Sequence, residues 1–244
     1  MRSDRIRNRG NHHVQKRYLA RRLEILRAAG RQFQDRGFAE TGMRDIAEAA
    51  TLSPANLYNY FRGKQEILFF CQDNSLDRLI AALEKARRLR AGAAEKLRLV
   101  INSHLRCVLD EVEGSAAHLL TGALPLRLQR RLLAKRDRYE EGVRQLIAAG
   151  VRSGEFVPCD AALIARILLG ALNWSVRWFN PEGPLSSVEL AEGFSDYLLR
   201  GLLMKPAAFS RQAVNRRPGR DVQTIARHSS VRRASAGRLF VGGD

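Results

Sequence analysis

The side chains best suited to specific chemistry follow Ser53-Pro54, an N-cap serine with proline at the first helical position. Beyond this start, small residues and residues with amide or phenol groups fall on the outer face of a short helix. Such groups form hydrogen bonds, and amides match the donor and acceptor pattern of base edges in a DNA groove. A tyrosine and a lysine nearby suit contacts with phosphate oxygens. The side chains concerned are Ala55, Asn56, Tyr58, Asn59, Tyr60 and Lys64.

Two short helices joined by a tight turn would position these side chains. The first is expected over residues 44–50, after Thr41 as its N-cap, and the second over residues 54–61. Small residues let the helices approach, and larger apolar residues fill the space toward a preceding helix at 20–36. This pattern is typical of a helix-turn-helix, whose second helix enters the major groove. The residues expected in its interior are Ile46, Ala47, Ala50, Leu52 and Leu57.

Each of these side chains also has a purely structural interpretation. Tyr58 and Phe61 can be core aromatics, and Thr41 can do no more than cap a helix. Asn56 can satisfy an orphan amide at the helix start. Two cations flanking a helix-turn-helix favour DNA contact, although solvated surface charge is the alternative. These cations are Arg44 and Lys64.

The stretch from residue 20 to residue 70 resembles the DNA-binding domain of the TetR family of transcriptional regulators. The resemblance is carried by Thr41, by the turn Leu52-Ser53, by Leu57-Tyr58-Asn59-Tyr60-Phe61 and by Lys64-Gln65-Glu66-Ile67-Leu68. It departs at Tyr60, where the family often has histidine, and this leaves the base preference open. The resemblance places Thr41, Arg44, Tyr58, Tyr60 and Lys64 where family members touch DNA, mostly its backbone. With the base-facing positions, the expected DNA-binding residues are Thr41, Arg44, Ser53, Ala55, Asn56, Tyr58, Asn59, Tyr60 and Lys64.

A second group of aromatic and basic side chains lies at residues 174–178. Trp174 and Trp178 are one helical turn apart with Arg177 beside them, a face able to stack an adenine and pair with a phosphate. The alternative is that these aromatics form the core of a dimer bundle. Residues 170–186 resemble the C-terminal domain of TetR-type regulators of fatty-acid, aromatic-acid and steroid catabolism, which implies an acyl-CoA or a related lipid or aromatic acid as effector. The expected ligand-binding residues are Trp174, Arg177, Trp178 and His104.

A run of basic residues follows residue 126. We interpret it mainly as a solvated face, with the steering of an anionic ligand as the alternative. Its members are Arg127, Arg130, Arg131, Lys135, Arg136 and Arg138.

No constellation for catalysis is apparent. The five histidines form no metal-ligand pair at helical spacing, and phosphate-binding, dinucleotide-binding and nucleophile-elbow motifs are absent. The three cysteines, Cys71, Cys107 and Cys159, are too sparse for a disulfide framework. No apolar run is long enough to cross a bilayer. The basic N-terminus is not followed by the apolar segment that a secretory signal peptide requires. We therefore expect a cytoplasmic non-enzyme with no cofactor, no metal and no membrane partner.

The net charge of +17 is concentrated at the two ends of the chain. Residues 1–22 contain eight Lys/Arg and one Asp, and residues 205–244 contain nine Lys/Arg and two Asp. Basic ends suit a polyanionic partner because each neutralised phosphate releases counterions. The alternative is that these segments only aid solubility.

Helical periodicity throughout predicts an all-α fold, with an N-terminal three-helix helix-turn-helix domain and a C-terminal helical domain for ligand binding and dimerisation. The expected division is a disordered basic arm at 1–15, the DNA-binding domain at 16–63, the ligand-binding and dimerisation domain at 64–204, and a disordered basic tail at 205–244. Beyond the motif, helices are expected over 64–89, 93–112, 115–133, 135–153, 160–179 and 187–204.

Together these patterns predict a homodimer that binds double-stranded operator DNA and leaves it when a small-molecule effector binds. The dimer is expected to form through the last two helices. A ligand-dependent activator, a nucleoid-associated protein that binds DNA nonspecifically, and an enzyme with an incidental helix-turn-helix remain alternatives. The residues expected at the dimer interface are Ile164, Ile167, Leu168, Ala171, Ala191, Phe194, Leu198 and Leu202.

Deleting residues 205–244 should lower affinity for nonspecific DNA while sparing the choice of operator, because the tail contributes charge but no base contacts. Competition binding with operator and unrelated duplexes measures both affinities. A truncated protein that fails to fold would show that the tail is structural.

Overall fold

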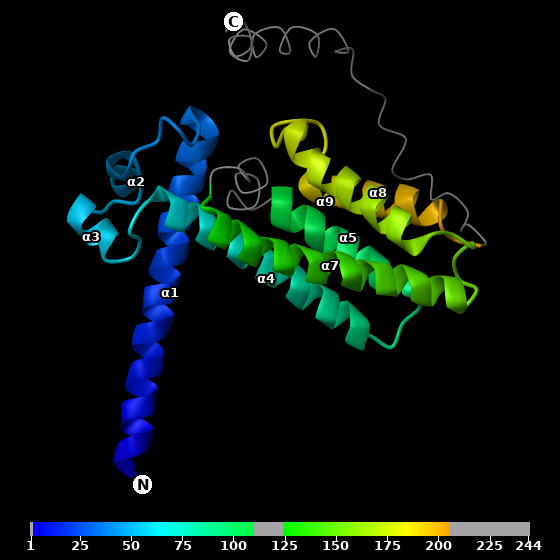
Figure 1. Ribbon diagram of the computed structural model, residues 1–244, viewed down its shortest axis with the longest axis horizontal. Coiled ribbons are helices and arrows are strands. Elements are labelled where there is room, and N and C mark those ends of the chain that lie inside the picture. Colours follow the sequence, from blue (N-terminus) through cyan, green and yellow to red (C-terminus); the bar gives the residue numbers. More distant parts are fainter. Residues whose placement is uncertain (1, 110–123, 205–244) are drawn as a thin grey trace, which may run out of the picture. The chain divides into compact units, whose positions relative to one another are not determined.

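The computed structural model describes residues 2–109 and 124–204, except for the side chains of residues 2–14 and 34. It confirms the predicted all-α fold (Figure 1). In the described ranges, β-type pairing is limited to one isolated bridge between Phe156 and Leu203. The helical elements are α1 (Arg2–Arg36), α2 (Met43–Ala49), α3 (Pro54–Tyr58), α4 (Lys64–Arg88), α5 (Ala93–Leu109), α7 (Leu126–Arg152), α8 (Ala161–Trp174), the 3-10 turn η2 (Ser175–Arg177) and α9 (Ser187–Arg200).

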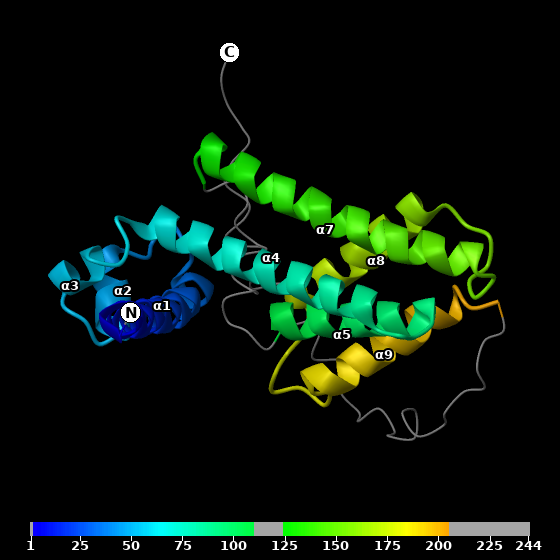
Figure 2. The ribbon, with the colours of Figure 1, turned by 90° about the horizontal axis from the view of Figure 1, so that it is seen from below.

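Helices α1, α2 and α3 enclose an apolar core together with the first turns of α4 (Figures 1 and 2). The expected interior residues Ile46, Ala47 and Leu57 are buried, and Ala50 and Leu52 pack against them half-buried. Helix α4 contributes Ile67 and Cys71 to this core, and α1 contributes four members at helical spacing. These four are Ile25, Leu26, Ala29 and Phe33.

The turn between α2 and α3 is closed by backbone hydrogen bonds. The amide of Thr51 donates to the carbonyl of Glu48 at 3.0 Å, and that of Leu52 donates to the carbonyl of Ala47 at 2.8 Å. Thr51 has a φ of 55°, a left-handed conformation that is costly for a β-branched residue. The sharp reversal between the two helices therefore carries local strain that the packed motif offsets.

The structure differs from the expectation at the start of α1 and at the end of α3. Helix α1 begins at Arg2, so residues 2–15 of the predicted disordered arm are helical. Extending an existing helix adds a hydrogen bond per residue without a new nucleus, and no proline interrupts residues 2–36. Helix α3 ends at Tyr58, three residues short of the predicted end, although the amides of Tyr60 and Phe61 still donate to the carbonyl of Leu57.

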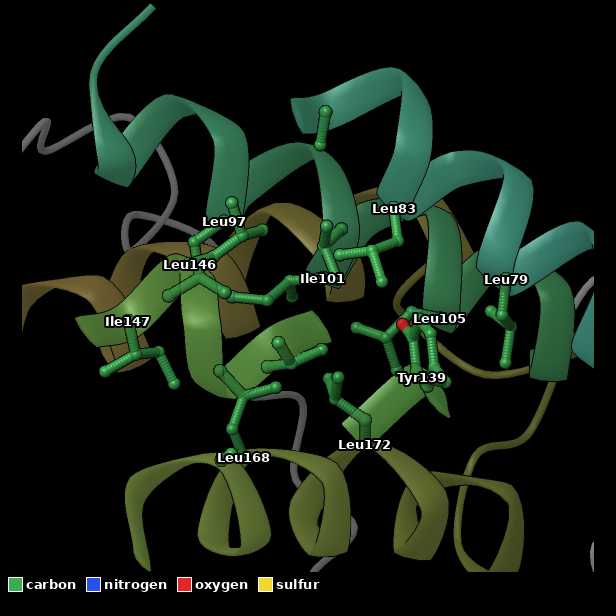
Figure 3. Packing of buried hydrophobic residues seen from close by; sticks show 14 of the residues in the cluster. Leu79, Leu83, Leu97, Ile101, Leu105, Tyr139, Leu146, Ile147, Leu168 and Leu172 are labelled. Carbon is green, nitrogen blue, oxygen red and sulfur yellow. The ribbon is translucent and has the colours of Figure 1, made fainter. Parts of the chain in front are cut away.

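Helices α5, α7, α8 and α9 form a second core with the later turns of α4 (Figure 3). Leu168 and Leu172 of α8 point into this core beside Leu146 and Tyr139 of α7. A Cβ on Gly142 would lie 2.1 Å from Cδ2 of Leu83, so α4 and α7 approach closely at this glycine. The absence of a side chain at this position thus lets Leu83 of α4 pack directly on α7.

The predicted break between 133 and 135 is wrong, because α7 runs without interruption from Leu126 to Arg152. Neither proline nor glycine lies near residue 134, and Leu132, Tyr139 and Val143 continue one buried stripe across it. The expected helix starting at 115 and the end of the 93–112 helix fall partly at residues 110–123, outside the described ranges. The expected tail at 205–244 also lies outside them.

Side-chain caps define the ends of the C-terminal helices. The carboxylate of Glu155 accepts from the amides of Ala93 and Ala94 at 2.5 and 3.0 Å, which caps α5 from 61–62 residues away in the chain. The predicted capping box of Ser186 and Glu189 is present at the start of α9. Helix α8 ends earlier than predicted because Ser175 Oγ donates to the carbonyl of Leu172 at 2.6 Å and the chain tightens into η2.

In the described part of the chain, no helix combines the length and the apolar character needed to cross a bilayer.

Candidate nucleic-acid interface and ligand cavity

The outer face of α3 is exposed, as the sequence predicts. Ala55, Asn56 and Asn59 are all exposed, while Leu57 on the opposite face is fully buried. Ser53 Oγ accepts from the amide of Asn56 at 3.2 Å, so Ser53 acts as the N-cap. Because the Asn56 amide is satisfied in this way, the carboxamide of Asn56 is not needed as a cap. The edge thus presents two carboxamides beside a small residue.

Aromatic residues at the end of α3 divide into an exposed and a packed group. Tyr58 is 53% exposed, which contradicts the alternative of a core tyrosine, whereas Phe61 is 1% exposed and belongs to the core. Tyr60 is half-buried, and its ring stacks on Tyr18 of α1 with centroids 5.2 Å apart. Its position is therefore set by α1 as well as by α3.

Thr41 does not occupy the exposed position that a DNA contact through its side chain requires. It is fully buried, and its Oγ1 lies 2.7 Å from the carbonyl oxygen of Gly37 and 3.1 Å from that of Gln32. The predicted N-cap role is also wrong, since Gly42 is the N-cap of α2 and its amide donates to the carboxylate of Asp45 at 2.7 Å. Thr41 instead ties the loop between α1 and α2 to the end of α1.

Lys64 has a structural role that the sequence prediction missed. Its Nζ donates to the carbonyl oxygens of Phe38, Ala39 and Thr41 at 2.8, 2.9 and 3.2 Å. An ammonium group has three donors, so these loop carbonyls use them all. Arg44, by contrast, is exposed on α2 and remains a candidate for phosphate contact.

Arg22 of α1, which was not among the predicted site residues, contacts both the segment after α3 and α4. Its guanidinium carbon lies 4.4 Å from the ring centre of Phe61 and 4.0 Å from that of Phe70. Its Nη2 lies 3.8 Å from a carboxylate oxygen of Glu66. The sequence gives little indication of this role. Arg22 is one of many basic residues on its helix, and its aromatic partners lie 39 and 48 residues away in the chain.

The C-terminal core contains a cavity of about 440 Å³. This volume lies within the range of small-molecule sites. The predicted ligand residues His104, Trp174 and Arg177 line it, and the guanidinium of Arg177 lies 5.8 Å from a Trp174 ring centre. The other lining residues are Leu76, Leu79, Arg136, Tyr139, Glu140, Leu169, Gly170 and Asn173.

Trp178, the fourth predicted ligand residue, does not line this cavity. Helix α8 ends at Trp174, so the two tryptophans do not share one helical face. Trp178 instead stacks on Phe194 of α9, with ring centroids 6.1 Å apart. It joins the end of α8 to α9.

A hydrogen-bonded row of two buried side chains, His104 and Tyr139, and the exposed Asn173 lines one wall of the cavity. His104 Nδ1 lies 3.2 Å from the Tyr139 hydroxyl, and its Nε2 lies 3.1 Å from Oδ1 of Asn173. The carboxamide oxygen of Asn173 can only accept, so His104 donates to it from Nε2, and Nδ1 accepts from the Tyr139 hydroxyl. Burial raises the pKa of Tyr139 far above its usual value, so this hydroxyl keeps its proton.

A smaller cavity of about 180 Å³ lies along α7. The charged residue Arg136 lines both cavities. Its Nη2 donates to Oε1 of Gln72 at 3.2 Å. Desolvation by burial lowers the pKa of Arg136. Of the basic residues that follow residue 126, Arg130 and Arg136 line the smaller cavity. The hypothesis that this run attracts an anionic ligand therefore applies to these two residues.

The predicted dimer residues divide between the interior and the surface. Leu168, Ala191 and Leu202 are buried in the subunit's own core, so the prediction that their side chains form an interface is wrong. Ile164, Ala171, Phe194 and Leu198 are half-buried, and Ile167 is 53% exposed. Helices α8 and α9 expose further apolar residues that were not among those predicted for the interface, namely Leu163, Trp174, Val188 and Tyr197.

The described residues contain no group of three or more His, Cys, Asp or Glu side chains that could hold a metal ion.

Comparisons with known proteins agree with the geometry of both regions. Residues 25–69 match the model of bacterial regulatory proteins of the tetR family, and residues 90–202 match that of the tetracycline-repressor-like C-terminal domain. The chain is 35% identical to the TetR family transcriptional regulator PfmR from Thermus thermophilus, with a TM-score of 0.68 over 72% of this chain and 97% of that one.

Two further relatives are informative. The transcriptional repressor KstR2 from Mycolicibacterium smegmatis is 28% identical over 75% of this chain and 91% of its own. The crystal structure of AibR in complex with isovaleryl coenzyme A and operator DNA is 25% identical, with a TM-score of 0.65 over 73% of this chain and 97% of that one.

Replacing Lys64 by methionine should destabilise the helix-turn-helix, because a charged donor to three loop carbonyls is lost. One hydrogen bond to a charged group contributes about 1.5–3 kcal/mol, so we expect a total loss of at least that size. Urea unfolding of the full chain measures it. The matched control is Arg62→Met, which removes an exposed cation two residues away. Equal stability of the two variants would contradict the structural role of Lys64.

Proposed function

We propose that this chain, which belongs to the TetR family of transcriptional regulators, is a homodimeric repressor that releases its operator when a small effector fills the larger cavity of the C-terminal core. The observation that carries the proposal is the exposed polar edge of α3. Its backbone amide at Asn56 is capped by Ser53, its inner face is buried through Leu57, and its carboxamides face outward. Such an edge suits hydrogen bonding to base edges in a major groove.

Each exposed residue has an expected role on DNA. Asn56 and Asn59 contact base edges, and Ala55 allows close approach or contact with a thymine methyl group. Arg44 and Tyr58 contact phosphates and thereby set the register of α3. Ser53 and Tyr60 act by positioning, the first as the N-cap and the second through its stacking on Tyr18. Thr41 and Lys64 support the loop before α2 without meeting the duplex through their side chains.

The dimer is expected to form across the outward face of α8 and α9. Leu163, Ile167 and Trp174 are 56%, 53% and 63% exposed, and their spacing places them along one face of α8. Tyr197 of α9 is 66% exposed. An apolar face of this kind favours burial against a second copy. Two-fold symmetry then places two α3 helices in successive major grooves about 34–36 Å apart, which implies a near-palindromic operator.

The effector is expected to be an acyl-CoA or a related lipid or aromatic acid. Leu76, Leu79 and Leu169 offer apolar walls, and Trp174 with Arg177 offers an aromatic and basic pair. The relative crystallised with isovaleryl coenzyme A supports this class. Helix α4 lines the cavity and also belongs to the helix-turn-helix core. A ligand that favours another arrangement of α4 shifts the population away from the DNA-competent state, and about 2–3 kcal/mol of differential affinity gives roughly hundredfold release.

Substituting Asn56 or Asn59 by alanine should relax the selected operator sequence at one position per half-site, because one base contact is lost. Arg44→Ala should weaken binding to all sequences and lower the salt slope by about one. Selection of bound duplexes from a random pool, followed by titration at several salt concentrations, measures both effects. Unaltered selectivity in both asparagine variants, or no enriched sequence for the wild type, would contradict the proposal.

Ile167→Glu should convert the dimer to a monomer, because a charge would be buried in the apolar interface. Analytical ultracentrifugation of the full chain measures the mass. Leu19→Glu places the same charge on an exposed leucine of α1 and should leave the mass unchanged. A monomeric wild type, or a dimer that survives Ile167→Glu, would exclude this interface.

A further inference from the structure

Arg136 occupies a position where the helical pattern calls for an apolar residue. On α7 it lies between Leu132 and Tyr139, which are 2% and 4% exposed and continue one buried stripe. Arg136 itself is half-buried and lines both cavities. Holding a guanidinium at such a position costs free energy unless a partner compensates it.

In the described part of the chain, the partner of Arg136 is neutral. Its hydrogen bond goes to the carboxamide of Gln72, a residue of α4 that is 3% exposed. The neighbouring carboxylates have other partners: Asp73 and Asp77 lie 2.6 and 2.7 Å from Lys135 Nζ, and Glu140 lies 3.3 Å from Arg166 Nε. Arg136 therefore pairs with no carboxylate among the described residues.

We propose that Arg136 is the receptor for an anionic group on the effector, and that this group takes the guanidinium away from Gln72. The inference rests on the proposed function and narrows the effector class to apolar molecules that carry an anionic oxygen. The apolar body fits against Leu76, Leu79 and Leu169 in the larger cavity, and the anion lies where the two cavities share Arg136. A charge-assisted bidentate pair is stronger than the single bond to a neutral amide, so the exchange is favourable.

The exchange has a direct route to the DNA-binding domain. Gln72 directly follows Cys71, which belongs to the buried core of the helix-turn-helix. Losing the bond from Arg136 therefore removes one tie between α7 and α4, next to a residue of the helix-turn-helix core. Lys135 remains paired with Asp73 and Asp77, so the change is local to the Arg136–Gln72 contact and does not separate α4 from α7.

Two fluorescent probes that differ by one anionic group test the proposal. 1-Anilinonaphthalene-8-sulfonate carries a sulfonate, and N-phenyl-1-naphthylamine has the same rings without it. Titration of the full chain should show at least tenfold tighter binding of the sulfonate probe. Equal affinities for the two probes, or no binding of the sulfonate probe, would overturn the proposal.

Matched variants locate the anion. Arg136→Gln should weaken binding of the sulfonate probe about tenfold and change that of the uncharged probe less than twofold. Gln72→Glu should do the same, because the new carboxylate pairs with Arg136 and competes with the probe. Arg138→Gln removes an exposed charge two residues away that lines neither cavity, and should have no effect. Loss of sulfonate binding in Arg177→Gln with full retention in Gln72→Glu would place the anion elsewhere and refute the role of Arg136.

These titrations need no operator DNA, so their outcome is independent of the test for operator binding. A chain that selects no DNA sequence but discriminates between the probes through Arg136 would refute the regulator and keep the anion receptor. The reverse result would keep the regulator and refute the receptor.

Discussion

The structure depends on one constraint, which is that a single unbroken helix belongs to two cores. Helix α4 contributes Ile67 and Cys71 to the core of the helix-turn-helix, and Leu79, Leu83 and Ala86 to the core of the C-terminal domain. Because buried cores are close-packed, a displacement of α4 in one of them cannot be absorbed without a response in the other. Gly142 reinforces the constraint by bringing α7 against α4 at Leu83. Packing thus provides the physical route by which ligand binding and DNA binding are coupled in the proposed function.

Several basic side chains of this protein make contacts within the fold and are therefore not available mainly for a binding partner. Lys64 satisfies three loop carbonyls, Arg22 lies between two aromatic rings, and Arg21 donates to the carbonyl of Ala50 at 3.3 Å near the end of α2. These contacts set the loop, the turn and the end of α3, which leaves Arg44 as the motif cation proposed to meet DNA. Net charge thus indicates attraction to a polyanion, but the side chains that touch it must be identified by their contacts and exposure.

Helix periods, caps and the motif spacing predicted the all-α fold, the capping box at Ser186 and the exposed edge of α3, because these features depend on residues close in sequence. The roles of Thr41, Lys64 and Trp178 depend on partners brought near by the fold, so family resemblance and helical spacing misplaced their side chains. The position of Arg136 could have been recognised from the sequence, because it falls in the register of the buried residues of α7. The basic residues around it instead favoured the interpretation of a solvated face. The division of the dimer residues likewise needed the fold, since Leu168 is buried and the adjacent Ile167 is exposed.

Hydroxyl-radical footprinting of the full chain on a selected duplex reports where α3 lies on DNA. Two symmetric reading helices should give two protected patches on one face of the duplex, with centres about 10 base pairs apart. A continuous protected stretch that follows the protein onto unrelated sequences would contradict this arrangement.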